Sequence, residues 1–129
     1  YSLPYLNRLL DSLDVPVKIV HICGRLHSIY QELAALHCDV FSFDACVSIE
    51  EIKPYLAGKA IMGNVNTHAL GSMSGNKIEQ LTKAALKKGT DIVAPACGLP
   101  LTTPLANIQR MVAAAKAEGS GDIEYELSD

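Results

Sequence analysis

Short apolar runs alternate along this chain with segments of helical periodicity, and this alternation constrains the fold more than any other feature. The four predicted strands are Val17–Cys23, Asp39–Phe43, Ala60–Val65 and Asp91–Ala94. None of them alternates polar and apolar residues over its length, which is typical of strands covered on both faces. Strict alternation of strands and helices predicts an α/β fold with parallel strands and right-handed crossovers.

The helical segments lie before, between and after these strands. The predicted helices are Leu3–Leu13, Leu26–Leu36, Ile49–Leu56, Lys77–Lys88 and a last helix from Thr103-Pro104 to about Lys116. Asn76 and Glu79 resemble a capping box, and Gly89 is a predicted C-cap. The turns that end in Asp39 and Asp91 look equivalent, which indicates a faint repeat of the βα unit.

Four consecutive βα units amount to half of an eight-stranded TIM barrel. The length predicts a single domain over residues 1–129, which ends in a polar tail over residues 118–129. Alone, four such units form an open sheet or pair with another copy. A half barrel leaves two edge strands unpaired, which favours self-association.

Composition excludes several classes of partner. The net charge is -3 and no basic run occurs, so we expect no nucleic-acid partner. No apolar run approaches the roughly 20 residues of a membrane span. The first residues lack the charged and apolar regions of a signal peptide, so we expect none. Because the chain begins with Tyr1, we expect a fragment or a processed product. The four cysteines of an α/β chain without a secretory signal predict reduced thiols and a cytoplasmic location.

Candidate metal ligands follow two of the predicted strands. His21 and Cys23 are two residues apart, so on an extended strand their side chains share a face. Cys97 lies just past the fourth predicted strand, and the carboxyl ends of parallel strands share one rim. One imidazole and two thiols suit zinc, with one position left open. The alternative is a core histidine and two small buried cysteines, but three ligand-type residues at two strand ends favour the metal.

Other polar residues on this rim are weaker candidates. For Asp44 two interpretations stay open. It binds a substrate group or orients His21 in one, and it is a turn-forming residue without a functional role in the other. The amides of Asn64 and Asn66 orient a ligand or form turns, and Cys46 is a reserve ligand. His68 lies in a predicted Gly-rich loop over residues 66–76, which either reaches over the mouth or leaves this histidine in solvent. The remaining candidates have predicted positions away from the chemistry: Cys38 at the opposite rim, and His27 and His37 exposed beside a helix.

Four stretches resemble the uroporphyrinogen decarboxylase superfamily and, within it, the methylcobamide:coenzyme M methyltransferases. They are residues 21–24 (HICG), 41–44 (FSFD), 62–65 (MGNV) and 94–100 (APACGLP), the last followed by 103–107 (TPLAN). The resemblance covers nearly the whole chain, as the carboxyl-terminal half of the family's TIM barrel. Decarboxylases of the superfamily lack the His-x-Cys motif combined with the later Cys, which favours the methyltransferase branch.

The resemblance implies a function in methanogenesis and a reaction. The family binds zinc through one His and two Cys, here His21, Cys23 and Cys97, and the zinc binds a thiol substrate as thiolate. That thiolate takes the methyl group from methylcobalamin on a separate corrinoid protein, so coenzyme M becomes methyl-coenzyme M and the cobalamin leaves as Co(I). Asp44 and Asn64 are the expected substrate-binding residues, and Arg25 is the one candidate for the sulfonate of coenzyme M.

Two alternative functions stay open at this stage. One is a decarboxylase-like enzyme that acts on a tetrapyrrole, with Asp44 at the mouth. The other is a non-catalytic half barrel stabilised by zinc, which offers a surface to a partner. The first half of the barrel is an expected partner in either case, because this chain carries only half of the mouth. The sequence leaves open the thiol acceptor, the methyl donor, the oligomeric state and the activity of the isolated chain.

Overall fold

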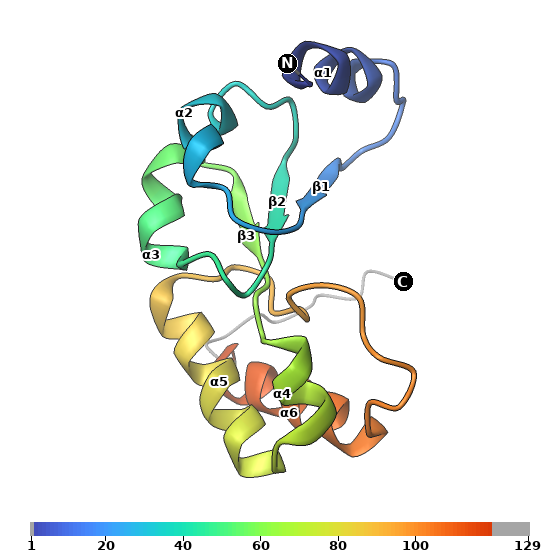
Figure 1. Cartoon of the computed structure of the whole chain (residues 1–129), viewed down its shortest axis with the longest axis vertical. Helices are drawn as coiled ribbons and strands as arrows, with labels where there is room; N and C mark the ends of the chain where they lie inside the picture. The colour runs from blue at the N-terminus through green and yellow to red at the C-terminus, as the bar shows by residue number, and fades with distance from the viewer. Residues whose placement is uncertain (1, 120–129) are drawn as a thin grey trace, which may run out of the picture.

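The computed structural model describes residues 2–119, and helices and strands alternate in it along the chain. In order, the elements are α1 (Leu3–Asp11), β1 (Ile19–Ile22), the 3-10 helix η1 (His27–Ile29), α2 (Tyr30–Leu33), β2 (Val40–Phe43), α3 (Ile49–Ile52), the 3-10 helix η2 (Lys53–Tyr55), β3 (Ala60–Met62), α4 (Thr67–Ser72), α5 (Gly75–Lys88) and α6 (Leu105–Gly119). Figure 1 shows the sheet with α1, α2 and α3 in one half of the molecule and α4, α5 and α6 in the other.

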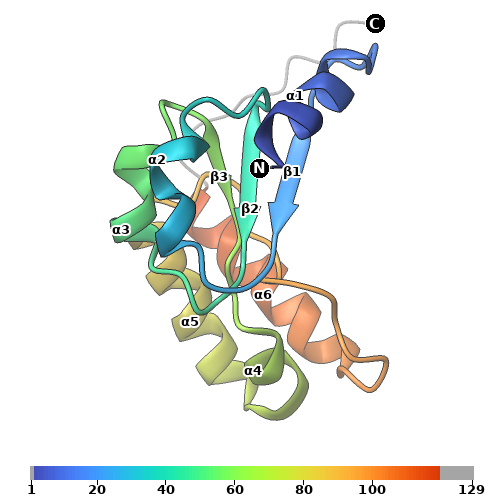
Figure 2. The same cartoon turned by 45° about the horizontal axis from the view of Figure 1, so that its top comes forward.

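The three strands form one parallel sheet in the order β1-β2-β3. His21 pairs with Ser42, and Ser42 pairs with Met62, so these three residues form one row across the sheet. Figure 2 shows the strands side by side, with α2 and α3 along one face. The predicted α/β class with parallel strands is therefore confirmed.

The fourth predicted strand, Asp91–Ala94, is not a strand in the structure. This segment runs parallel to β3 and its continuation, but only two isolated bridges form, from Met62 to Ile92 and from Val65 to Pro95. Gly63, between the two bridged positions, has φ +134°, which lies outside the strand region and interrupts the ladder. Pro95 has no N–H to donate, which limits pairing at the other bridge.

Two of the predicted helices are each divided into shorter pieces. The segment predicted as Leu26–Leu36 contains η1 and α2, and Ile29, the last residue of η1, has φ -125°, outside the helical range. The segment predicted as Ile49–Leu56 contains α3 and η2, because Pro54 lacks the N–H that a continuous α-helix needs. Both segments pack against the sheet in the larger apolar cluster.

The segment 66–76, predicted as a Gly-rich loop, contains the helix α4 and the start of α5. The Asn66 side chain caps α4 by accepting a hydrogen bond from the Ala69 N–H at 3.0 Å. Helix α5 begins after Ser74, two residues before the predicted start, so the predicted capping box at Asn76 is wrong. The predicted C-cap is confirmed, since Gly89 has the left-handed φ of +104°.

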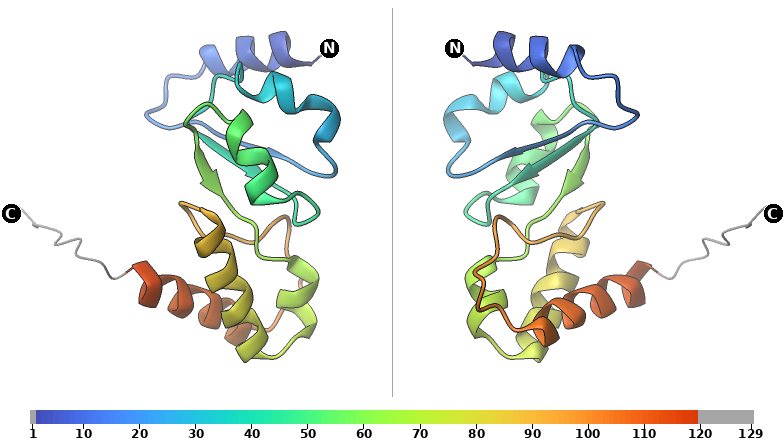
Figure 3. Two further views of the ribbon diagram at one scale, coloured as in Figure 1. Left: turned by 90° about the vertical axis from the view of Figure 1, so that its left-hand side faces the viewer. Right: turned by 90° about the vertical axis from the view of Figure 1, so that its right-hand side faces the viewer.

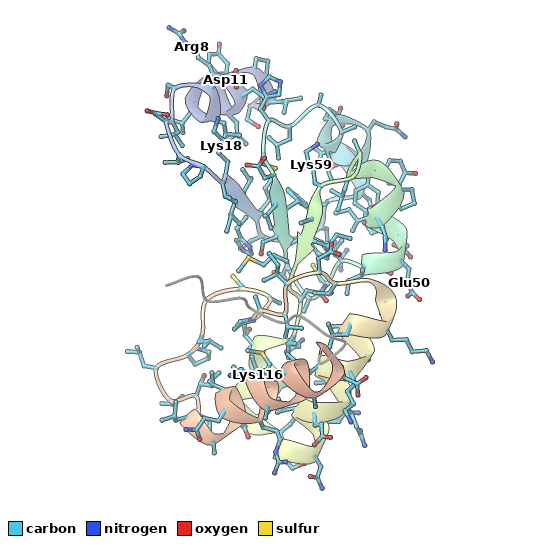
Figure 4. The ribbon with its side chains drawn as sticks, turned by 180° about the vertical axis from the view of Figure 1, so that it is seen from behind. Arg8, Asp11, Lys18, Glu50, Lys59 and Lys116 are labelled. Atoms are coloured by element: carbon cyan, nitrogen blue, oxygen red, sulfur yellow. The ribbon has the colours of Figure 1, made fainter. Side chains whose placement is uncertain are left out.

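The repeat that was noted at Asp39 and Asp91 has a structural basis. The Asp39 carboxylate accepts a hydrogen bond from the Lys18 N–H at 2.7 Å, and the Asp91 carboxylate accepts one from the Ile61 N–H at 2.8 Å. Each aspartate thus joins its own segment to the preceding strand, at the amino ends of the strands. Figure 4 shows Lys18 and Lys59, which precede β1 and β3, at this end of the molecule.

Two apolar clusters hold the structure together. The larger one lies between the sheet and helices α1 to α3, and it includes the fully buried Phe41, Phe43 and Ile52. The smaller one, which includes Leu70 and Ile78, joins α4, α5 and α6. Figure 3 shows these two groups of elements one above the other in side view.

The last helix, α6, reaches Gly119, so Glu118 is helical rather than part of the predicted polar tail. The rest of that predicted tail, residues 120–129, lies outside the described residues. Within residues 2–119, no helix combines the length and the apolarity that a membrane crossing requires.

Candidate metal centre

The structure brings His21, Cys23 and Cys97 together at the carboxyl ends of the strands. His21 and Cys23 lie on the same face at the end of β1, and the bridge from Val65 to Pro95 carries Cys97 to the same rim. His21 Nε2 lies 2.9 Å from Cys23 Sγ, and Cys23 Sγ lies 3.2 Å from Cys97 Sγ. All three ligand atoms lie within 4.8 Å of one another. A single cation can therefore contact all three.

The donor set and its spacing fit a zinc ion. Tetrahedral zinc holds sulfur at about 2.3 Å and nitrogen at about 2.0 Å, which places two such ligands roughly 3.6–3.8 Å apart. The distances from Cys23 Sγ to His21 Nε2 and to Cys97 Sγ are shorter than these ligand–ligand distances. For zinc to bind, each must lengthen by less than about 1 Å. Both cysteines are free and exposed. Three protein ligands leave one position open, as in zinc sites that bind a substrate.

The electrostatics of the cluster also favour a cation. The hydrogen bond with Cys97 is the main reason that the pKa of the Cys23 thiol is raised, and burial and the nearby Cys97, Asp44 and Cys46 groups raise it further. The neighbours of Cys23 thus oppose its negative charge. A bound cation reverses this effect, because it stabilises thiolates directly.

Ser42 belongs to the cluster, although no sequence argument identified it. Its hydroxyl oxygen lies 2.9 Å from His21 Nδ1, on the side of the ring away from Cys23. Ser42 is buried and pairs with His21 in the sheet register. The available signal was a single polar residue in the otherwise apolar run Val40–Phe43, one strand away from the histidine.

Asp44 and Asn64 hold together the loops beneath the rim. The Asp44 carboxylate accepts hydrogen bonds from the Gly24 N–H at 3.4 Å and the Cys46 N–H at 3.2 Å. The Asn64 amide donates to the carbonyl oxygens of Asp44 at 3.3 Å and Val47 at 3.0 Å. Among the described residues the Nδ1 partner of His21 is Ser42 rather than Asp44. A substrate-binding role for either residue stays a prediction.

The remaining candidates lie where the sequence placed them, with one exception. Cys38 precedes β2 at the opposite rim and is partly buried, and Cys46 is exposed on the site side. His27 and His37 are exposed and pair with acidic side chains at 3.2 and 2.9 Å. The exception is His68, which is exposed but lies in helix α4 rather than in a loop.

The metal candidate borders an open hollow on the face of the sheet opposite α2 and α3. Its lining residues are Ile19, His21, Ser42, Met62, Pro95, Cys97 and Gly98. Solvent therefore reaches the ligand atoms from this side, and a small molecule can reach them by the same route.

Parallel βα units that carry ligand-type side chains on the rim at their carboxyl ends define an α/β protein with a barrel-type site. The family model described as uroporphyrinogen decarboxylase (URO-D) matches residues 1–118. The chain belongs to the uroporphyrinogen decarboxylase family.

Several relatives of this chain carry the names of methyltransferases. It is 30% identical over 120 residues to the methylcobamide:CoM methyltransferase MtbA of Methanosarcina acetivorans, which covers 90% of this chain and 35% of the relative. It is 32% identical over 107 residues to the methylcobamide:CoM methyltransferase MtaA of Methanosarcina barkeri, which covers 76% and 30%. A methylated-thiol–coenzyme M methyltransferase of Methanosarcina mazei is 30% identical over 125 residues, which covers 90% and 32%.

A solved structure gives the same picture. A methyltransferase from Methanosarcina mazei superposes with a TM-score of 0.84 at 28% identity, over 92% of this chain and 36% of that one. The resemblance found in the sequence is confirmed, and so is the fold class of βα units that correspond to part of a TIM barrel. The chain spans about a third of the length of the curated relatives it matches.

Proposed function

We propose that this chain is the metal-binding part of a zinc-dependent methyltransferase that transfers a methyl group from a methylated corrinoid protein to a thiol such as coenzyme M. The observation that carries the proposal is the convergence of His21 Nε2, Cys23 Sγ and Cys97 Sγ within 4.8 Å. The names of the relatives, which are methylcobamide or methylated-thiol methyltransferases, support the choice of reaction.

The three side chains would hold the ion and leave one position for the substrate sulfur. Zinc, when bound there, supplies a Lewis acid that favours the deprotonated form of a thiol at neutral pH. The chain itself contributes the geometry: β1 fixes His21 and Cys23, and the bridged segment at Pro95 fixes Cys97. The open hollow beside them gives a small thiol a route to the rim.

We also propose that the rest of the barrel completes the mouth. Apolar side chains are exposed along both edges of the sheet: Val17 before β1 at 54%, Ile19 in β1 at 53%, and Ile92 on the bridged segment at 41%. A covering layer of βα units would bury them, and self-association is the other way to do so. The corrinoid protein would approach the completed mouth. Reduced thiols at the site suit a cytoplasmic location.

Substrate contacts on the rim belong to the same proposal. Asp44 and Asn64 would shape the loops that face the substrate, since they brace the ends of β1 and β2. Arg25 is exposed and directly follows the Gly24 turn, so it would reach an anionic group on the thiol substrate.

Metal analysis of the purified protein tests the central claim. We expect one zinc per chain, and loss of that zinc in Cys23→Ser and Cys97→Ser. Cys38→Ser is a matched control, because Cys38 is a free cysteine at the opposite rim. Absence of zinc from the protein, or equal zinc loss in all three variants, would contradict the proposed site.

The reaction needs a separate assay. The chain is combined with the remaining part of the barrel, and transfer of the methyl group from methylcobalamin to coenzyme M is measured. We expect turnover that depends on zinc and is lost in Cys97→Ser. Zinc-dependent thermal stability without any methyl transfer would instead identify a non-catalytic half barrel, and binding of a porphyrinogen without metal would identify a decarboxylase-like protein.

A further inference from the structure

Ser42 occupies a position that the metal proposal does not yet use. It is the polar residue of β2, and only 5% of its surface is exposed. Its neighbours Phe41 and Phe43 are completely buried on the other face, within the large apolar cluster. The strand is therefore anchored on both sides of Ser42, which fixes the position of its hydroxyl.

The hydroxyl faces the ring of His21. Ser42 and His21 are register partners on adjacent parallel strands, so their side chains project from the same face of the sheet. Ser42 Oγ lies 2.9 Å from Nδ1, while Nε2 of the same ring lies 2.9 Å from Cys23 Sγ. The two ring nitrogens are thus divided between the serine and the thiol cluster.

This division has a chemical consequence. A neutral imidazole carries a proton on one nitrogen and a lone pair on the other. To bind a cation through Nε2, His21 must carry its proton on Nδ1, and that N–H needs an acceptor. Ser42 Oγ lies at the right distance to accept it.

We propose that Ser42 is a positioning residue of the metal centre: it accepts the hydrogen bond from His21 Nδ1–H and so directs the Nε2 lone pair toward Cys23 and Cys97. The inference rests on the proposed zinc site and adds to it the residue that orients one ligand. Ser42 acts through His21 and is not one of the three ligands.

A hydroxyl suits this role better than a carbonyl oxygen. Because it is both a donor and an acceptor, Ser42 can also donate to Nδ1 when Nε2 carries the proton and faces the Cys23 sulfur. The ring therefore keeps one orientation before and after a metal enters. Binding then needs a shift of a proton within the ring, not a rotation of the side chain.

Zinc affinity measured by competition with a chromophoric chelator tests the proposal. We expect Ser42→Ala to bind zinc about 10-fold or more weakly, as for other hydrogen-bond partners of metal-bound histidine. Ser42→Thr keeps the hydroxyl, suits a strand, and should restore affinity to near that of the parent protein. Ser72→Ala is the matched control, because the Ser72 hydroxyl bonds the His68 carbonyl far from the ligands.

The ring nitrogens give a second measurement, which begins with the parent protein. In the zinc-loaded parent protein, ¹⁵N NMR should show His21 with Nε2 on the metal and a slowly exchanging proton on Nδ1. In Ser42→Ala that proton should exchange faster, even where the overall fold is unchanged.

The outcomes separate the two proposals. Zinc on Nδ1 of His21, or equal zinc affinity in the parent and Ser42→Ala, overturns the role of Ser42 while the metal site stands. A parent protein that binds no zinc overturns both. A third outcome is weak zinc binding in both Ser42→Ala and Ser42→Thr, with a rapidly exchanging Nδ1 proton in the parent. It would show that packing at this position matters rather than the hydroxyl, and it also overturns the role of Ser42.

Discussion

Cys23 and Cys97 are 74 residues apart in the sequence, yet their sulfur atoms lie 3.2 Å apart. The first comes from the end of β1, at one edge of the sheet, and the second from the bridged segment beyond β3. The sheet between them must curve for the two ends to meet, as strands do around the mouth of a barrel. The contact is thus a direct consequence of the parallel βα order.

The closeness of these two thiols predicts their oxidation in the metal-free protein. A mild oxidant such as diamide, which takes two hydrogen atoms, should join them in an intrachain disulfide, because the sulfurs need to approach by only about 1 Å to reach the usual bond length. Peptide mapping by mass spectrometry should find the Cys23–Cys97 pair. Stoichiometric zinc should protect both thiols, and replacing Cys46 with Ser should leave the reaction unchanged. A mixture of pairs that includes Cys38 would contradict the observed geometry.

The reactivity of Cys23 should depend on Cys97. The pKa of the Cys23 thiol is raised, mainly by its hydrogen bond with Cys97. Since the thiolate is the nucleophile, alkylation of metal-free protein by iodoacetamide at neutral pH should be slower at Cys23 than at an unperturbed thiol. The rate should rise only at higher pH. In Cys97→Ala the largest cause is removed, so the pH midpoint of alkylation should move down. An unchanged midpoint in that variant would show that Cys97 does not control this thiol.

The order of elements could be predicted from the sequence because burial on both faces leaves continuous apolar runs. The runs that contain Val20, Phe41 and Ile61 predict the strands, and the structure confirms all three. The fourth run fails for reasons that its own apolarity does not reveal: Gly63, which follows β3 in the neighbouring segment, adopts a positive φ, and Pro95 lacks a donor.

The missed features have two different causes: one is local to its segment, and the other depends on a contact between segments. Helix α4 was hidden by Gly71 and Ser72, which are weak helix formers, and its start depends on the Asn66 cap. Ser42 could be noticed as a polar residue in an apolar strand, but its role depends on the register with His21. Which of several ligand-type residues meet is set by that register too.

The two repeated aspartates should each contribute to stability. Their carboxylates accept hydrogen bonds from the backbone of the preceding strand segment, at Lys18 and Ile61. A hydrogen bond to a charged group is worth about 1.5–3 kcal/mol, and exposure to solvent weakens it. Because both aspartates are exposed, Asp39→Ala and Asp91→Ala should each lower the free energy of unfolding by about 1 kcal/mol. Urea denaturation measures this, with Asp14→Ala as the control on the exposed surface. Equal midpoints for all four proteins would show that these bonds add nothing.

Asn64 gives a test that separates a structural role from a role in substrate binding. Its amide donates to the carbonyl oxygens of Asp44 and Val47, which lie partly buried beneath the rim. Asn64→Ala leaves both carbonyls without this donor and should lower the free energy of unfolding by about 1–3 kcal/mol. Because the hydrogen bonds of the Asn64 amide go to Asp44 and Val47 and not to a metal ligand, zinc affinity should stay within about threefold of the parent. If stability is unchanged while the KM for the thiol rises in the reconstituted enzyme, the amide binds substrate directly and the structural role is wrong.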